Sequence, residues 1–325
     1  MSGTQKDNTH YESEIPLYLK DNEKISAIPW MNLSPETITI VSFFGDDSSK
    51  IQTYSLLGWF KGMSSLKNVE NLCDRSVDSS NIKYMSETFS GCNSLQGLIN
   101  IDVCFTPSEA ADASYCFKGC SNLTSIAGIS PFKSVQNAQS LFEERSKLTQ
   151  IDLSLFNNSP ISNAQSMFQG VAVDSELGLN FSELSKANFS NLTYASSMFI
   201  QAKLSNRNLS TCSFASLQTI ESMFQGTQGI DSIVFNRSSE ASAVTNMNYA
   251  FDSCSCKRIN ISFIDNTQLT GTVSMKGAFK GCQNLTRIIV DTNKWNINKV
   301  TNYDTTFSNC SVKLAGIAVD GTSCK

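Results

Sequence analysis

Ten phenylalanines recur at a nearly constant interval along this chain of 325 residues. Successive members of the series are separated by 29, 28, 25, 26, 31, 25, 27, 28 and 28 residues. An interval of this length indicates one supersecondary unit that is repeated, each copy burying its apolar face against the next. We therefore predict a solenoid of about ten rungs. The phenylalanines are Phe60, Phe89, Phe117, Phe142, Phe168, Phe199, Phe224, Phe251, Phe279 and Phe307.

The residues after each phenylalanine also repeat. In the clearest copies a glycine stands two positions on, as Gly91 and Gly281 do, and we expect it to adopt a left-handed backbone that ends a short helix or a single turn. Apolar residues recur six and nine positions on, and we expect both to point into the core. They are Leu66, Leu95, Leu123, Leu148, Ile230 and Leu285, and then Val69, Leu98, Ile126, Ile151, Leu177, Ile233 and Ile288.

The second apolar position lies in a segment whose side chains alternate in character. Residues 151–153, 233–235 and 288–290 show the period of two that is typical of a strand, so we predict one short parallel strand per rung. The outward positions of these strands are the expected binding surface, the alternative for each being an ordinary solvated position. The candidate binding residues are Gln150, Asp152, Ser232, Val234, Arg287, Ile289 and Asp291.

The repeated pattern M-F-x-G-C-x-x-L-x-x-L-D-L-S-x-F, followed by a polar V-T-N-M linker, resembles the BspA-like leucine-rich repeats of bacterial and protist surface proteins. It is seen here in residues 148–156 and 244–247, and the resemblance covers roughly residues 51 to 325. It implies an α/β solenoid, a leucine-rich-repeat right-handed superhelix of about ten rungs with one short parallel strand per rung. It also implies display at the cell surface or outside the cell, and protein binding or adhesion. No catalytic residue belongs to the family pattern.

Three segments follow from this pattern. Residues 1–50 lack the repeat and are predicted to form an N-terminal arm and cap that includes a strand-like stretch at 38–44. Residues 51–311 are the leucine-rich repeat solenoid, and residues 312–325 are a C-terminal cap. Residues 315–319 read as a strand with one free edge, which favours a homo-oligomer joined through the solenoid ends.

Charge and hydropathy exclude two classes of partner. The net charge of -4 provides no basic face, so we expect no nucleic acid partner. No stretch of about 20 apolar residues is present, so we expect no membrane span. Residues 1–24 contain no apolar run flanked by basic residues, so the sequence does not indicate an export route.

Eleven cysteines are an odd number, so at least one is unpaired or bonded outside the chain. Cys92, Cys120, Cys254, Cys282 and Cys310 each stand three residues after a repeated phenylalanine. This row is either a metal or redox site or a set of buried thiols, and we favour buried thiols because Met63, Val171, Ala202 and Thr227 occupy the same place elsewhere. Candidate disulfides are Cys310 with Cys324 in the C-terminal cap, and Cys73 with Cys104 between neighbouring strands.

The chain contains eleven N-x-S/T sequons, against about six or seven expected by chance for its composition. Candidate glycosylation sites are Asn122, Asn188, Asn208 and Asn284. We expect several to carry glycan in a protein secreted by a eukaryote and none in a bacterial protein.

The sequence provides little for catalysis. The single histidine, His10, lies in a polar arm, and the Asp46 and Asp47 pair fits a turn better than a metal site. We predict no enzyme activity and no cofactor. Two functions remain. The first is a binding or adhesion module that recognises a protein or glycan ligand on a host, the matrix or a neighbouring subunit; the second is a structural subunit of an extracellular filament, sheath or surface layer.

Overall fold

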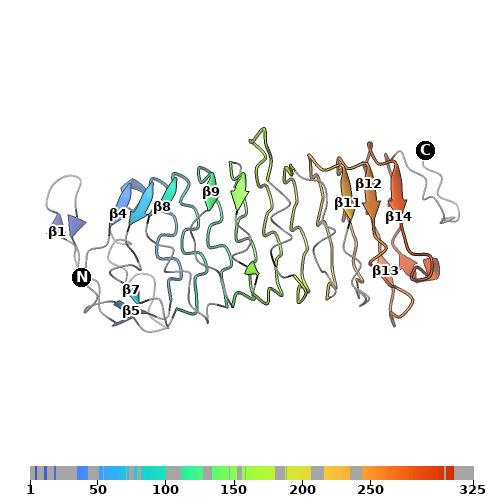
Figure 1. Ribbon diagram of the computed structural model, residues 1–325, viewed down its shortest axis with the longest axis horizontal. Coiled ribbons are helices and arrows are strands. Elements are labelled where there is room, and N and C mark those ends of the chain that lie inside the picture. The colour runs from blue at the N-terminus through green and yellow to red at the C-terminus, as the bar shows by residue number, and fades with distance from the viewer. Residues whose placement is uncertain are drawn as a thin grey trace.

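The repeats lie side by side, in sequence order, along the long axis of the molecule (Figure 1). This computed structural model describes residues 4–5, 11–12, 18–19, 35–42, 51–53, 55–70, 72, 77–78, 82–99, 111–126, 134–145, 147–151, 156–157, 159–179, 187, 189–205, 216–234, 244–303 and 305–310. The strands β4, β8, β9, β11, β12 and β14 follow one long edge of the stack. Each repeat is numbered below by its phenylalanine, from Phe60 in repeat 1 to Phe307 in repeat 10.

The strands on this edge are two or three residues long and pair in parallel, as predicted. One sheet contains β4 (Ile40–Ser42), β6 (Asn68–Glu70) and β8 (Gly97–Ile99). A second contains β11 (Ser232–Val234), β12 (Arg258–Asn260) and β14 (Arg287–Ile289). Between them, β9 (Ser125–Ile126) pairs with β10 (Gln150–Ile151). The described strands thus form separate small sheets and no closed sheet.

One strand per repeat is not found throughout the described chain. Repeats 5 and 6 carry single parallel bridges in place of a strand, Leu179 with Leu204 and Lys203 with Gln228. Three further small sheets lie away from this edge. They are the parallel set β3 (Tyr18–Leu19), β5 (Ile51–Thr53) and β7 (Val77–Asp78), the parallel pair β13 (Val273–Ser274) and β15 (Val300–Thr301), and the antiparallel pair β1 (Thr4–Gln5) and β2 (Tyr11–Glu12).

The segment around each phenylalanine consists of turns and is not helical. In the described part of the chain the helical elements are two single 3-10 turns, η3 (Pro35–Thr37) and η9 (Ile297–Lys299). The prediction of helices in an α/β class is therefore wrong for these residues. A single turn, which was the alternative prediction to a short helix, forms instead.

We use the name phenylalanine segment for the residues from five before each repeated phenylalanine to three after it. Its backbone is bonded to the next repeat by N–H groups at alternate positions, as when Leu56, Gly58, Phe60 and Gly62 donate to carbonyls of repeat 2. The same three or four bonds, in the same direction, join each following pair of repeats up to repeat 10. From Ser55 to Ser274 the first residue of the segment also makes a parallel bridge at every step, and Ser274 then pairs with Thr301, just before the segment of repeat 10. This ladder fixes the register of the repeats.

The residues two positions before and two positions after the phenylalanine have a left-handed backbone, and this makes the backbone path possible. Two positions after it stand glycines with φ near 70°, such as Gly91 and Gly119, as predicted. Glu144 and Gln201 adopt the same conformation at φ 60° and 54°, and a Cβ at Gly91 or Gly119 would meet no atom closer than 3.6 Å. Residues other than glycine therefore fit here at a cost of about 1–2 kcal/mol of backbone strain.

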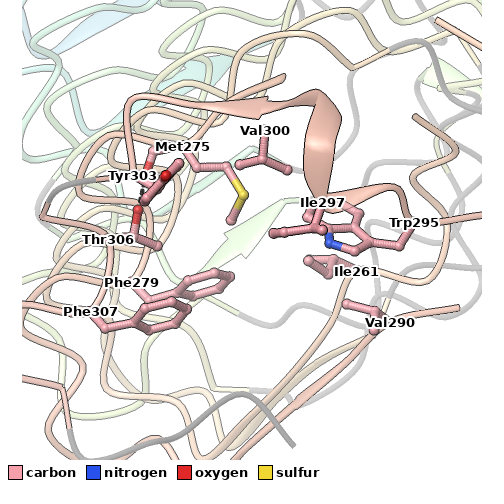
Figure 2. A pocket seen from close by; sticks show the side chains of 10 residues that line it. All are labelled: Ile261, Met275, Phe279, Val290, Trp295, Ile297, Val300, Tyr303, Thr306 and Phe307. Carbon is pink, nitrogen blue, oxygen red and sulfur yellow. Dashed lines mark hydrogen bonds between the residues drawn. The ribbon is translucent and has the colours of Figure 1, made fainter. Parts of the chain in front are cut away.

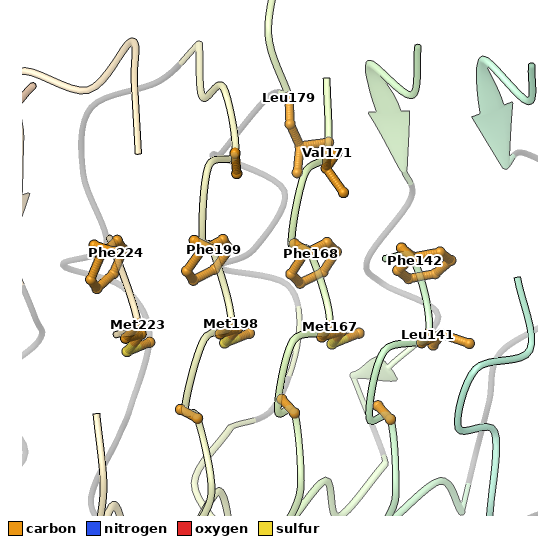
Figure 3. Packing of buried hydrophobic residues seen from close by; sticks show 14 of the residues in the cluster. Leu141, Phe142, Met167, Phe168, Val171, Leu179, Met198, Phe199, Met223 and Phe224 are labelled. Carbon is orange, nitrogen blue, oxygen red and sulfur yellow. The ribbon is translucent and has the colours of Figure 1, made fainter. Parts of the chain in front are cut away.

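The ten phenylalanine rings form one continuous stack through the core. Neighbouring ring centroids lie 5.1 to 6.1 Å apart, with interplanar angles of 1° to 21°. Figure 3 shows four of these rings above a second row of buried side chains, Leu141, Met167, Met198 and Met223, each just before its phenylalanine. Ring spacing close to the spacing of strands shows that one repeat advances the stack by one strand.

The residue three positions after the phenylalanine has a specific bonding role. The thiols of Cys92, Cys120 and Cys282 each lie 2.8 to 3.0 Å from the carbonyl oxygen of the preceding repeat's phenylalanine, and the Thr227 hydroxyl donates to the same place at 2.8 Å. A small side chain that carries a weak donor suits this buried position. The core therefore explains Cys92, Cys120 and Cys282, whereas the Cys254 thiol donates to Cys256.

Arg145 occupies this cysteine position in repeat 4 and is fully buried. Its Nε donates to the Phe117 carbonyl at 2.9 Å, and its guanidinium lies 5.0 Å from the Phe117 ring and 5.8 Å from the Phe142 ring. Both terminal nitrogens are buried with no hydrogen-bond acceptor among the described residues. Burial lowers the pKa of Arg145 from its usual range. The widest gap in the ring stack, 6.1 Å, lies between these two phenylalanines.

The apolar positions six residues after the phenylalanine are buried as predicted, but one position nine residues after it is not. Leu177 is 76% exposed, and Leu179 is buried in its place. Repeat 5 is followed by the longest interval, 31 residues, and the additional chain moves the inward position by two residues.

The predicted N-terminal cap is partly described, and the predicted C-terminal cap is not. β4 lies within the predicted strand-like stretch and pairs in parallel with β6, and the Ser42 hydroxyl donates to Glu70 at 2.9 Å. The predicted C-terminal cap, residues 312–325, lies outside the described residues.

Removing one ring from the middle of the stack should cost more than removing the last ring. We expect Phe199→Ala to lower the free energy of unfolding by about 3–5 kcal/mol, because a fully buried ring with two stacked neighbours is replaced by a cavity. Phe307→Ala should cost about 2 kcal/mol or less, because that ring is only partly buried. Urea denaturation followed by circular dichroism measures both. Equal losses would contradict a continuous stack.

Arg145→Met should stabilise the protein. We expect the free energy of unfolding to rise by about 1–3 kcal/mol, because the desolvation of two unpartnered nitrogens outweighs one hydrogen bond. The matched change is Met63→Arg at the same position of repeat 1, which should lower stability. A loss of stability in Arg145→Met would show that the contacts of the guanidinium with the two rings are net stabilising.

Candidate functional site

The sheet of β11, β12 and β14 presents one side to the core and the other to solvent. Its middle residues, Ile233, Ile259 and Ile288, lie side by side and are buried. The described residues on either side of them, Ser232, Arg258, Asn260, Arg287 and Ile289, therefore point outward, as the alternation in the sequence predicted for Ser232, Arg287 and Ile289. We call the outward side of these three strands the strand face.

The first outward row of the strand face contains Ser232, Arg258 and Arg287 in register. Ser232 is half-buried, and the two arginines are exposed. Ser232 and Arg287 were predicted, but Arg258 was missed. Arg258 stands seven residues after its phenylalanine, whereas Ser232 and Arg287 stand eight after theirs, so a one-residue deletion in repeat 8 hides the equivalence.

The second outward row contains Asn260 and Ile289, and the backbone of Val234 is in register with them. Ile289 and Asn260 are half-buried, and the Asn260 side chain accepts a hydrogen bond from the Ser262 N–H at 2.9 Å. Asp291 lies beyond the end of β14, where its carboxylate accepts a hydrogen bond from the Asn293 N–H at 3.1 Å. Asn260 and Asp291 thus shape the turns that follow their strands.

The other two predicted binding residues are not part of this sheet. Gln150 lies in β10, opposite Ser125 of β9. Asp152 lies outside the described residues. The structure therefore brings together Ser232, Val234, Arg287 and Ile289, and places Gln150 in a different sheet.

The charges on the strand face are mainly positive. Lys257 makes a long ion pair with Asp231, 3.7 Å between Nζ and Oδ1; the Lys257 side chain is largely exposed and Asp231 is half-buried. Within the described chain no ion pair involves Arg258 or Arg287. Like charges at adjacent positions of a sheet are destabilising, so this pair of arginines has no evident structural purpose.

Two of the four candidate glycosylation sites lie within the described residues. Asn284 is exposed, and Asn122 is half-buried and accepts a hydrogen bond from Lys147 Nζ at 2.8 Å. Asn188 and Asn208 lie outside the described residues. The predicted disulfide of Cys310 with Cys324 is not tested, because Cys310 is buried and described but Cys324 is not.

The cysteines were the second candidate site. Within the described ranges no group of three or more His, Cys, Asp or Glu residues is arranged to hold a metal ion. Burial raises the pKa of Cys116 to about 12 and raises the pKa values of Cys92, Cys120 and Cys282 as well. The Cys254 and Cys256 sulfurs lie 3.1 Å apart, and that hydrogen bond together with burial raises the pKa of Cys256.

An apolar pocket lies near the C-terminal end of the described stack (Figure 2). Trp295 and Ile297 form one side of it, and Phe279 and Phe307 form another. Its cavity volume is about 20 Å³, which accommodates roughly one water molecule. The pocket is too small for an organic ligand, so the strand face is the better candidate site.

The part of the chain that the structure describes contains no helix with the length and apolar character needed to cross a bilayer.

The buried thiols should be unreactive in the native protein. At pH about 8, a pKa near 12 leaves about one thiol in ten thousand ionised, so we expect iodoacetamide to label Cys116 at least about a hundredfold more slowly than in concentrated urea. Peptide mass spectrometry resolves each site, and free cysteine added to the same reaction serves as the control. Rapid native labelling of Cys254 or Cys256 would contradict a purely structural role for that pair.

Comparison with known proteins identifies the family. A family model described as "Mycoplasma protein of unknown function, DUF285" matches three stretches, residues 54–177, 111–236 and 235–315. No curated protein and no solved structure matches the chain. Repeated matches to one model agree with the repeated unit seen in the ring stack. Because the matches together extend over most of the chain, from residue 54 to residue 315, this protein belongs to the DUF285 family.

Proposed function

We propose that this protein is a non-enzymatic binding or adhesion module that works at the cell surface or outside the cell. In this proposal the repeats form a leucine-rich-repeat solenoid of the BspA-like kind, wound as a right-handed superhelix, and the strand face contacts the ligand. The ligand is a protein or glycan on a host, in the matrix or on a neighbouring subunit.

One observation carries the proposal: two exposed arginines stand next to each other on an ordered, open sheet, with no described acidic partner. The sheet is rigid because its inner side is buried throughout by Ile233, Ile259 and Ile288. Side chains on rigid strands hold their positions better than those on loops, and adjacent like charges are tolerated where a ligand compensates for them.

The second candidate is a structural subunit that assembles end to end. It is favoured by the apolar surface of the last two repeats, where Ile297 is 38% exposed, Tyr303 is 42% exposed and Phe307 is only partly buried. Apolar side chains of this size at the end of a stack are candidates for contact with a second copy.

Sedimentation and negative-stain microscopy, with and without reductant, separate the two candidates. For the binding module we expect discrete elongated particles at the monomer mass of 35.6 kDa in both conditions. Filaments or sheets, above all ones that reductant loosens, would contradict the binding module and support the structural subunit.

A steric block tests the face itself. We expect Ser232→Trp to reduce the binding of labelled protein to cultured cells or to a mixed extracellular-matrix coating, because the indole would cover the part of the strand face beside Arg258. The matched control is Gln165→Trp, an exposed position in the phenylalanine segment of repeat 5. Equal binding by both variants would show that the ligand contacts another surface.

A further inference from the structure

We propose that Arg258 and Arg287 form a binding site for the sulfate or carboxylate groups of an acidic polysaccharide. This inference rests on the proposed function and names the ligand class of the strand face. The two arginines stand opposite each other in the parallel pair of β12 and β14, and neighbouring strands lie about 4.8 Å apart. Their side chains leave the sheet in the same direction and are both exposed.

The local charge is opposite to that of the whole chain. Lys257, Arg258 and Arg287 contribute three positive charges, and Asp231 and Asp291 contribute two negative charges, so this patch carries +1 on a protein with a net charge of -4. An isolated basic patch on an acidic protein attracts anionic ligands, and the negative charge of the rest of the protein repels them from its other surfaces. Planar guanidinium groups bind sulfate and carboxylate through paired hydrogen bonds.

The shape of the surface favours a polysaccharide over a protein. Protein interfaces are usually centred on large aromatic or apolar side chains. The large exposed apolar residues of the described chain are Ile40, Leu57, Tyr84, Val173, Leu177, Tyr194, Ile297 and Tyr303, and none of the described side chains of β11, β12 and β14 is among them. The positions near the arginines include the short or polar Ser232, Asn260 and the exposed Thr286, and the apolar Ile289 among them is half-buried. They suit the hydroxyl groups of a sugar chain that lies across the strands.

The test compares three immobilised probes on the monomeric protein: dextran sulfate, uncharged dextran and polyglutamate. We expect binding to dextran sulfate that weakens as salt is raised, and no binding to dextran. Arg258→Gln with Arg287→Gln should weaken binding to dextran sulfate by about tenfold or more. The matched control, Lys276→Gln with Lys280→Gln, removes the same charge from exposed positions in the phenylalanine segment of repeat 9 and should change binding less than about twofold.

Several results would overturn the inference. These are no binding to dextran sulfate, an equal loss in both double variants, or binding to polyglutamate as tight as to dextran sulfate, which would point to an acidic protein segment. A failure of this inference can be distinguished from a failure of the proposed function. If Ser232→Trp prevents attachment to cells or matrix while dextran sulfate is not bound, the strand face still binds a ligand and only the ligand class is wrong.

Discussion

Each repeat is held to the next by the hydrogen bonds of the phenylalanine segment, and the rest of the structure depends on this contact. Three or four N–H groups at alternate positions donate to carbonyls of the following repeat, while a ring stacks on the ring of its neighbour at about 5.5 Å. The backbone bonds set the register and the rings fill the space between repeats. The strand face inherits its order from them, since β11, β12 and β14 are aligned by the same one-repeat step.

The same contact explains why irregular repeats are tolerated. A residue two positions after the phenylalanine needs a left-handed backbone but has space for a side chain, so Glu144, Gln201 and Ser253 can replace glycine. In five repeats the residue three positions after it donates to a phenylalanine carbonyl, which cysteine and threonine do with little volume. Arg145 does so with one nitrogen and leaves two others unpartnered in the core. Repeat 4 therefore keeps the register but places a buried charge in the core.

The sequence pattern predicted the period, the buried leucines and the parallel strands, because each depends on a residue type that recurs at a fixed place. It failed where the spacing changes. The long interval after Phe168 exposes Leu177, and the short repeat 8 concealed Arg258 as the neighbour of Arg287. Arg145 could have been found, since it stands where cysteine was expected. The left-handed residues two positions before the phenylalanine could not, because Glu87, Tyr115 and Ser140 share no chemical property that signals a positive φ.

Most hydrogen bonds of the phenylalanine segment run in one direction, and this gives the stack a polarity. At each step three or four N–H groups of one repeat donate to carbonyls of the following repeat, whereas the first residue of some segments, such as Asn163, donates back to the preceding repeat. Two copies that met through identical ends of this ladder would oppose most donors to donors or most acceptors to acceptors. Contact through this segment therefore favours head-to-tail order over a two-fold axis, and growth of that kind along the stack axis would be open-ended and would not close at a dimer.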